Sequence, residues 1–234
     1  MKSRIDRWTT RNLTYLHRRF YLDHRRHRPL ELVWEQSAAE SASFISANLE
    51  YAVLFDSRED LWRHALRSMP SDGLIMECGV FQGQSINMIA DWLSARRDQR
   101  LAHGFDSFEG LEEDWFGENL PAGFFDLKGR LPSVRANVQL HKGWVQDTVA
   151  PFLAEHPDQP IALVHIDTDT YTPARYILET VKSRLKSGSL VVFDELVGYP
   201  NWQRHEYKAL CETMDAASYD FIGFTSRQAI LRIK

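Results

Sequence analysis

The chain of 234 residues contains only two cysteines, Cys78 and Cys211. Because two cysteines do not form a disulfide framework, we expect a reduced protein in the cytoplasm. No run of about 18 apolar residues occurs, so we expect no membrane-spanning helix. The basic N-terminus is not followed by the apolar segment of a secretory signal. The dinucleotide-binding fingerprint G-x-G-x-x-G is also absent, which disfavours a nicotinamide-dependent oxidoreductase.

The chain also lacks an overall positive charge: its formal net charge is −4, and 44% of its residues are hydrophobic. This composition predicts a domain with a full core and excludes a bulk nucleic-acid binder. Positive charge is concentrated in residues 1–30, which hold eight arginines against two aspartates. We expect residues 1–50 to form a basic helical arm and residues 51–234 to form the main domain. The arm is interpreted as a lid or a homodimer contact; a solvated tail, or contact with anionic membrane or nucleic acid, are the alternatives.

Short apolar segments alternate with helical patterns after residue 70. Such alternation is typical of βαβ units in a parallel sheet. Residues 37–69 are predicted to be helical, with an N-cap at Asp56 or Ser57. The tail after 218 indicates two antiparallel strands. We therefore expect an α/β fold: a mostly parallel, seven-stranded, doubly wound sheet with a terminal antiparallel strand and helices on both faces. The other expected strands are 73–80, 101–106, 137–143, 160–167 and 188–194, and the other expected helices are 84–97, 145–155, 172–186 and 203–217.

Acidic residues stand at the ends of four of these strands. Ligands of open α/β sheets bind beyond the carboxyl ends of the strands. One acid alone would more often be a helix cap or part of a solvated turn, but the set together favours a binding site. Its members are Glu77, Asp106, Asp167, Asp169, Asp194 and Glu195.

The stretch "MECGVFQGQS" differs from a phosphate-binding loop in its charge and its bulk. A carboxylate at Glu77 would repel phosphates and attract an ammonium group. Asp106, at the end of the second strand, is placed to accept hydrogen bonds from a ribose. A ligand with adenine, ribose and an ammonium but no phosphate is S-adenosylmethionine. Ser85 and the amides at the start of the following helix would hold its carboxylate.

Three acids at neighbouring strand ends, Asp167, Asp194 and Glu195, are candidate metal ligands. Converging carboxylates repel one another unless a cation lies between them, and all-oxygen ligation suits Mg²⁺ or a similar divalent cation. Two alternatives remain open: the carboxylates point apart into solvent, or a basic residue supplies the counter-charge. Lys142, Lys182 and Arg175 are the nearest candidates in sequence.

Several segments resemble a known family. "ECGVFQGQSINMIA", "KGWVQDTVAPFL", "HIDTDTY" and "SGSLVVFDE" resemble the motifs of small metal-dependent O-methyltransferases of the catechol type. "FDSFEGL", "GWVQDT", "IDTDTY" and "VVFDE" are more similar to the macrocin O-methyltransferase family, which methylates sugar hydroxyls of macrolides. Two positions depart from these patterns. Glu195 stands where the macrolide enzymes more often carry aspartate, and Thr170 stands where the catechol enzymes carry a lysine base.

The resemblance implies a Rossmann-like class I methyltransferase fold and S-adenosylmethionine as the methyl donor. It also implies a divalent metal and, as acceptor, a hydroxyl of a sugar or another natural product. Asp167 or Asp169 would take the proton, with His205 as a reserve base. The aromatic and acidic insertion 107–133, with Trp115, Phe116, Phe124 and Phe125, would face the acceptor. The residues expected to hold the methyl donor are Glu77, Gly79, Phe81, Gly83, Ser85, Asp106, Ser107, Trp144, Gln146 and Asp147.

Other classes of function are less consistent with the sequence. A non-catalytic protein that keeps the fold would not need the full set of acids. A nucleic-acid methyltransferase would need the motif N-P-P-Y/F, which is absent. The sequence therefore predicts an enzyme that acts on a small molecule.

Overall fold

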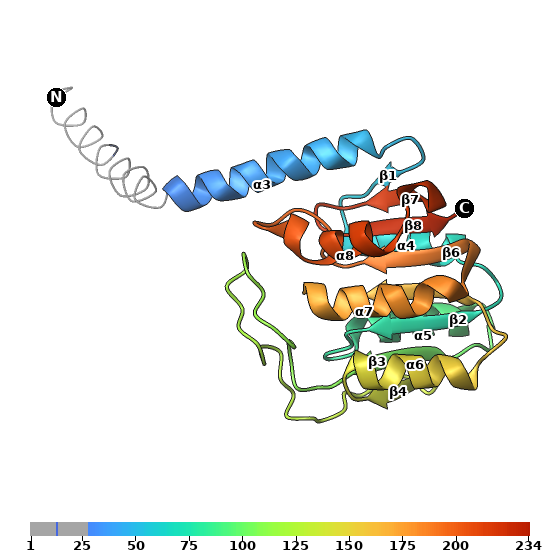
Figure 1. Cartoon of the computed structure of the whole chain (residues 1–234). Coiled ribbons are helices and arrows are strands. Elements are labelled where there is room, and N and C mark those ends of the chain that lie inside the picture. The colour runs from blue at the N-terminus through green and yellow to red at the C-terminus, as the bar shows by residue number, and fades with distance from the viewer. Residues whose placement is uncertain (1–12, 14–27) are drawn as a thin grey trace, which may run out of the picture.

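The computed structural model describes residues 28–234 and Leu13, and the helices expected within residues 1–27 lie outside this part of the chain. Residues 28–234 contain an eight-stranded sheet with the order β1-β7-β8-β6-β5-β2-β3-β4 (Figure 1). Only β8 is antiparallel to its neighbours. The strands are β1 Val53–Leu54, β2 Leu74–Cys78, β3 Ala102–Asp106, β4 Val138–Lys142, β5 Ile161–Ile166, β6 Leu185–Phe193, β7 Tyr219–Phe224 and β8 Ala229–Ile233.

This sheet confirms the expected α/β class and corrects its details. Eight strands are present in the described residues where seven were expected, because Val53 and Leu54 pair in parallel with Gly223 and Phe224. The antiparallel strand β8 is last in the chain, but it lies between β6 and β7 rather than at the edge of the sheet.

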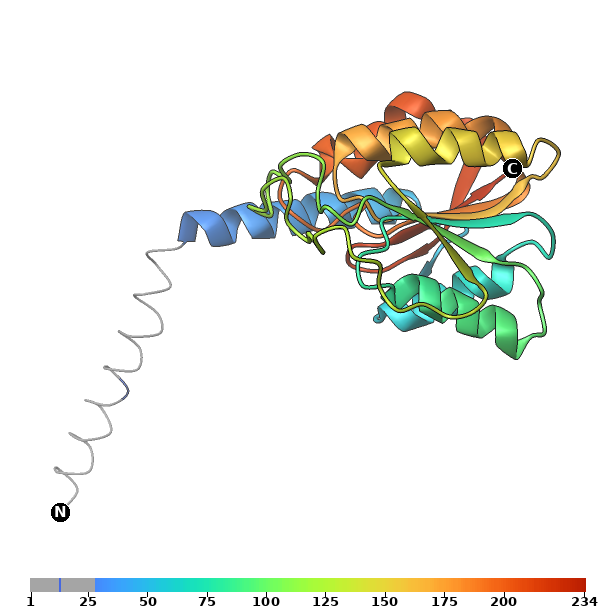
Figure 2. The same ribbon diagram turned by 90° about the horizontal axis from the view of Figure 1, so that it is seen from below.

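Helices cover both faces of the sheet, as the sequence predicts. Figure 2 shows α6, α7 and α8 on one face, and α4 and α5 on the other. Two separate apolar clusters form the core: one contains Phe105, Phe152 and Phe193, and the other contains Ile86 and Leu163. The helices are α3 Arg28–Ala47, α4 Arg58–Ser68, α5 Gln84–Ala95, α6 Val145–Glu155, α7 Tyr171–Val181 and α8 Glu206–Thr213, with short 3-10 turns at Lys182–Arg184, Trp202–Arg204 and Ala216–Ser218.

The stretch 37–69, expected to be helical throughout, is divided by β1 into the end of α3 and the whole of α4. Ser57 is the N-cap of α4, and its hydroxyl accepts a hydrogen bond from the Asp60 amide at 3.1 Å. This cap satisfies one of the unpaired amides of the first turn. Leu61 and Trp62 then bury the inner face of α4, so the start of the helix is fixed against the sheet.

Helix α3 packs on the domain at its C-terminal end and projects from it at the other end (Figures 1 and 2). The Phe44 ring lies 5.1 Å from the Tyr207 ring and 5.5 Å from the Phe221 ring, measured between centroids. By contrast, Leu30 and Trp34 are exposed. The last turns of the expected arm are therefore part of the domain core, and a lid or dimer role for the arm stays a prediction.

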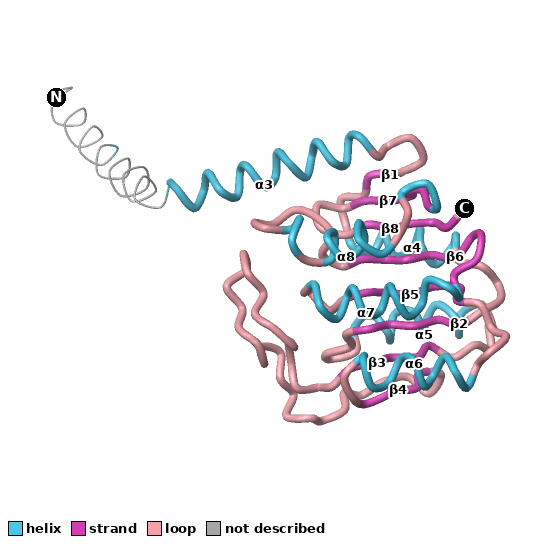
Figure 3. Tube along the Cα trace, viewed as in Figure 1, coloured by secondary structure: helices cyan, strands magenta, loops and turns pink. Residues whose placement is uncertain are grey.

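Residues 107–133 form a long loop whose described backbone contains one isolated bridge, between Trp115 and Leu120. Figure 3 shows this loop beside the edge of the sheet where the parallel strands end. The loop therefore covers the position where ligands of such sheets bind. None of the described helices is long and apolar enough to span a bilayer.

Candidate active site

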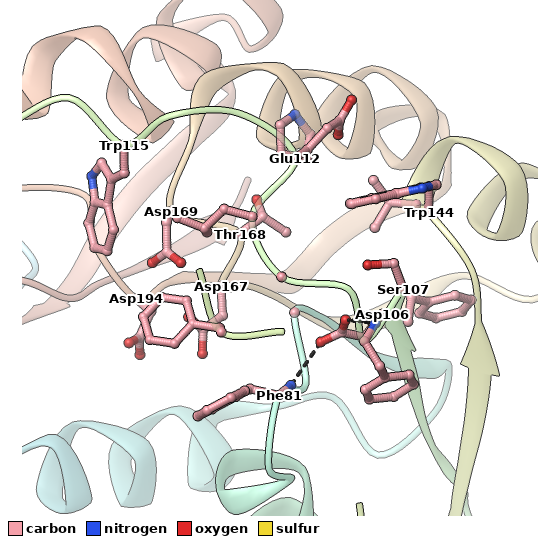
Figure 4. Close-up of a pocket in the computed structure, with 18 of the residues that line it drawn as sticks. Phe81, Asp106, Ser107, Glu112, Trp115, Trp144, Asp167, Thr168, Asp169 and Asp194 are labelled. Atoms are coloured by element: carbon pink, nitrogen blue, oxygen red, sulfur yellow. Dashed lines mark hydrogen bonds between the residues drawn. The ribbon is translucent and has the colours of Figure 1, made fainter. Parts of the chain in front are cut away.

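A cavity of about 280 Å³ opens at the carboxyl ends of β2, β3, β5 and β6. Figure 4 shows two ends of this cavity. Asp167, Asp169 and Asp194 gather at one end, and Asp106 and Trp144 lie at the other. Of the residues predicted to bind the methyl donor or a metal or to take the proton, those that line the cavity are Gly79, Phe81, Asp106, Ser107, Trp144, Asp167, Asp169, Asp194 and Glu195.

The glycine loop after β2 lies directly against the end of β5. Gly79 has a φ of +88°, and a Cβ there would lie 1.7 Å from the carbonyl oxygen of Asp167. Only glycine has the conformation and the small size that this approach requires. Gly79 therefore brings the backbone of the loop next to the acidic end of the cavity.

The Asp106 carboxylate orders the same loop. One of its oxygens accepts hydrogen bonds from the Val80 and Phe81 amides at 2.8 Å each, and the other accepts from the Phe108 amide at 2.6 Å. Figure 4 shows the bond to Phe81. Asp106 also lines the cavity, so contact with a ribose is sterically open and stays a prediction.

Glu77 takes a position that the sequence did not indicate. Its side chain is buried under the loop and is not among the residues that line the cavity. Its carboxylate lies 3.0 Å from Nδ1 of His165, whose Nε2 lies 3.5 Å from Asp194 Oδ1. Burial by itself would lower the pKa of His165, but contact with the carboxylates of Asp194 and Glu77 raises it to about 10. His165 therefore links Glu77 to the acidic cluster of Asp167, Asp169, Asp194 and Glu195. The contact of Glu77 with the methyl donor stays a prediction.

Gly83 and Ser85 also lie outside the cavity lining. Gly83 is the N-cap of α5, with a φ of +80°, and Ser85 is buried in the first turn of that helix. Their predicted role in holding a carboxylate stays a prediction.

Only Trp144, of the three residues predicted near an adenine, lines the cavity. It is the N-cap of α6. The Gln146 amide instead donates to the Glu112 carboxylate, at 2.8 and 3.0 Å to its two oxygens. Gln146 thus connects the 107–133 loop to α6. Asp147 does not line the cavity, and its role near an adenine stays a prediction.

The acids at the ends of β5 and β6 converge, as the sequence predicts. Oxygens of Asp167, Asp169 and Glu195 lie within 4.8 Å of one another, and a second group joins His165, Asp167 and Asp194 within the same limit. Burial, followed by the charge of Asp194, raises the pKa of Asp167 and Glu195 well above their ordinary values. The same causes raise the pKa of Asp169 to about 7. The carboxylates therefore do not point apart into solvent.

Asp194 behaves differently from the other acids. Burial by itself would raise its pKa, but the hydrogen bond and charge of His165, followed by Arg58, lower it to about 2. The contacts of Asp194 with His165 and Arg58 therefore favour its ionised form, in contrast to those of the other acids.

Arg58 is the cation that sequence reasoning missed. Its guanidinium lies 3.0 Å from Asp194 Oδ1 and 3.7 Å from Asp167 Oδ2. Two of the basic residues suggested by the sequence have other partners: Lys142 donates to the Gly129 carbonyl and Arg175 pairs with Glu179. No sequence signal marks Arg58, because it stands in an amphipathic helix more than a hundred residues before the acids.

His205, the expected reserve base, lies outside the cavity. Its Nε2 is 2.9 Å from the Phe116 carbonyl oxygen, and it lines a separate cleft together with Tyr171 and Arg204. A role for His205 as reserve base therefore has no contact with this cavity behind it and stays a prediction. Thr170 is fully buried at the start of α7 and is not part of the cavity lining either.

Glu206 is a second residue of this region that the sequence does not indicate, because an acid in the first turn of a helix is common and needs no functional explanation. It is fully buried, and its Oε2 accepts a hydrogen bond from the Glu195 amide at 3.3 Å. Burial, followed by the charge of Asp169, raises its pKa well above the ordinary value. Glu206 therefore holds the backbone at Glu195, directly after Asp194.

The 107–133 loop contributes to the cavity in part. Trp115 and Phe125 line it, as predicted for an acceptor-facing loop, whereas Phe116 and Phe124 do not. Phe116 is largely exposed.

Residues 76–196, more than half of the chain, match the family described as "Methyltransferase domain". The chain belongs to this methyltransferase family. A comparison with curated proteins finds no significant match. The matched residues of this methyltransferase run from the glycine loop to the acids at the end of β6.

Solved structures similar to the methyltransferase include the calicheamicin methyltransferase CalS11. This likeness has 28% sequence identity and a TM-score of 0.60, and it covers 74% of this chain and 76% of CalS11. An apo structure of CalS11, described as a TDP-rhamnose 3'-O-methyltransferase of calicheamicin biosynthesis, gives a TM-score of 0.55 at the same identity and coverage. The O-methyltransferase NovP, 19% identical over 75% of this chain and 78% of its own, shares the fold with a TM-score of 0.54.

These comparisons confirm the Rossmann-like methyltransferase fold and the expected enzyme class, an S-adenosylmethionine-dependent O-methyltransferase. The narrower resemblance to macrocin O-methyltransferases stays a prediction.

Proposed function

We propose that this methyltransferase transfers the methyl group of S-adenosylmethionine to a hydroxyl of a sugar or another natural-product acceptor. One observation carries the proposal: a single cavity joins Asp106 and Trp144 at one end to the acidic cluster at the other. The likeness to CalS11, described as a TDP-rhamnose 3'-O-methyltransferase, supports a sugar hydroxyl as the acceptor.

The donor would occupy the end of the cavity at Asp106 and Trp144. When bound, S-adenosylmethionine supplies an electrophilic methyl group on its sulfonium. Asp106 is positioned to accept from ribose hydroxyls, and the Trp144 ring offers a flat apolar face for an adenine. Phe81 lies below Asp106 in Figure 4 and also lines the cavity.

The acidic end fits a divalent cation. The carboxylate oxygens of Asp167, Asp169 and Glu195 lie within 4.8 Å of one another, and Asp194 lies within the same limit of Asp167 and His165. Oxygen ligands suit hard cations such as Mg²⁺. One oxygen of Glu195 is buried without a hydrogen-bond partner, and such an oxygen is costly to leave unpaired. Asp167, Asp194 and Glu195 would hold the cation, which when bound supplies Lewis-acid activation of the acceptor hydroxyl.

Asp169 is the residue to which we assign the proton of the acceptor hydroxyl. It lines the cavity and has a φ of +62°. This left-handed conformation is uncommon for residues other than glycine, and such strain is concentrated at functional sites. Burial and the charge of Asp194 raise the pKa of Asp169 to about 7, which is suited to proton transfer near neutral pH.

The test is methyl transfer from S-adenosylmethionine to TDP-rhamnose and to a panel of other sugars and phenols, followed by mass spectrometry. We expect one acceptor class to gain a single methyl group, and we expect Asp169→Asn to lose about 100-fold in kcat or more. Donor binding without transfer to any hydroxyl acceptor would instead favour a non-catalytic binding protein. A homodimer, a cytosolic location and a role in natural-product biosynthesis stay predictions.

A further inference from the structure

Helix α4 delivers a fixed positive charge to the acidic end of the cavity. Arg58 is its first residue, directly after the N-cap Ser57. Trp62, one turn further on, is buried, and its ring lies 4.7 Å from the His165 ring, measured between centroids. The start of α4 is therefore anchored beside the same histidine that contacts Asp194.

Arg58 is bound to only part of the acidic cluster. Its guanidinium forms ion pairs with Asp194 and, at longer distance, with Asp167. Within residues 28–234, Asp169 and Glu195 form no ion pair with a lysine or an arginine. Arg58 thus balances the charge of the Asp167 and Asp194 part of the cluster, and the Asp169 and Glu195 part has no cationic partner among the described residues.

The Arg58 side chain is also partly open to solvent. It is 41% exposed, against 11% for the Asp194 side chain with which it pairs. A guanidinium turned toward solvent would be rehydrated, whereas the acids would remain buried and would repel one another. A divalent cation at Asp167 and Asp194 would approach the same oxygens and would be repelled by a nearby guanidinium.

We propose that Arg58 is an internal counter-ion that competes with a divalent cation for Asp167 and Asp194. Without metal, Arg58 holds the acidic cluster together. When metal binds, Arg58 is displaced toward solvent, and the work of displacing it sets the affinity for metal. This inference rests on the metal site of the proposed function.

The test compares Arg58→Gln with Arg63→Gln in the full chain. Arg63 is a matched control because it belongs to the same helix, pairs with Asp60 and is 50% exposed. Binding of Mg²⁺ and of Mn²⁺ is measured by calorimetry on the protein without donor or acceptor, and the melting temperature is measured in EDTA and in Mn²⁺.

We expect R58Q to melt at a lower temperature than the wild type in EDTA, and to recover most of that loss in Mn²⁺. Its affinity for Mn²⁺ should rise by about tenfold, the change that corresponds to about 1.4 kcal/mol. R63Q should match the wild type in both measurements.

Equal or weaker Mn²⁺ binding by R58Q would overturn the proposal, and so would the absence of metal binding by both proteins. Affinity for S-adenosylhomocysteine, measured on the same samples, separates this failure from failure of the proposed function. If R58Q binds S-adenosylhomocysteine like the wild type and its affinity for metal is unchanged, only the proposed role of Arg58 is rejected, and the proposed function stands.

Discussion

Substituting Gly79 by alanine tests whether the glycine loop must touch the end of β5. Two separate costs apply. At a φ of +88° the backbone conformation of an alanine costs about 1–2 kcal/mol relative to an unstrained conformation. Its Cβ would also lie 1.7 Å from the Asp167 carbonyl oxygen, which is backbone and does not rotate away. Forced overpacking of this kind costs about 1–3 kcal/mol, so the sum is about 2–5 kcal/mol.

Gly123→Ala is the matched control. Gly123 has a φ of +77°, but a Cβ there has no heavy atom within 4 Å. The free energy of unfolding of G123A should therefore fall only by the cost of the strained backbone conformation, about 1–2 kcal/mol. The difference between the two variants isolates the contact between the loop and Asp167.

The assay is urea denaturation of both variants together with calorimetric titration of S-adenosylhomocysteine. We expect G79A to unfold at a lower urea concentration than G123A and to bind the ligand at least about tenfold more weakly. G123A should bind like the wild type. Equal losses of stability in the two variants, or full ligand affinity in G79A, would refute this reasoning.

Two further predictions concern the acidic end of the cavity. EDTA should reduce methyl transfer at least about tenfold and Mg²⁺ should restore it; unchanged turnover in EDTA would contradict the metal site. His165 has a folded-state pKa of about 10, above its ordinary value of 6.5. Its contribution to stability is therefore complete below pH 6.5 and is lost as the pH rises toward 10. Urea titrations across that window should show a slope of up to about 1.4 kcal/mol per pH unit in the wild type. That slope should be absent in His165→Gln, and an equal slope in both would assign it to another group.

Much of the fold could be predicted because the buried parallel strands are nearly continuous apolar runs. β2 and β5 are buried at every position, so the predicted limits of both strands lie within two residues of the observed ones. The predicted bounds of α6, 145–155, are the observed bounds. β1 could not be predicted, because two exposed residues paired with β7 carry no pattern of their own.

The acids at the strand ends could also be predicted, because the topology of a parallel sheet brings strand ends together. Their partners could not. Arg58, on α4, and Glu206, on α8, reach the cluster from helices on opposite faces of the sheet, and such contacts depend on tertiary packing. For Glu77, the sequence pattern predicted its place at the end of a strand. It could not predict that His165, on the neighbouring strand, pairs with it.

The most direct test of the proposed site is the binding of S-adenosylhomocysteine to the wild type, to Asp106→Ala and to Asp194→Asn, measured by calorimetry without metal. The donor is assigned to the Asp106 end of the cavity and the acceptor to the Asp194 end. We therefore expect one ligand per chain in the wild type, affinity reduced at least about tenfold in D106A, and nearly unchanged affinity in D194N. No binding by the wild type, or an equal loss in D194N and D106A, would contradict this assignment.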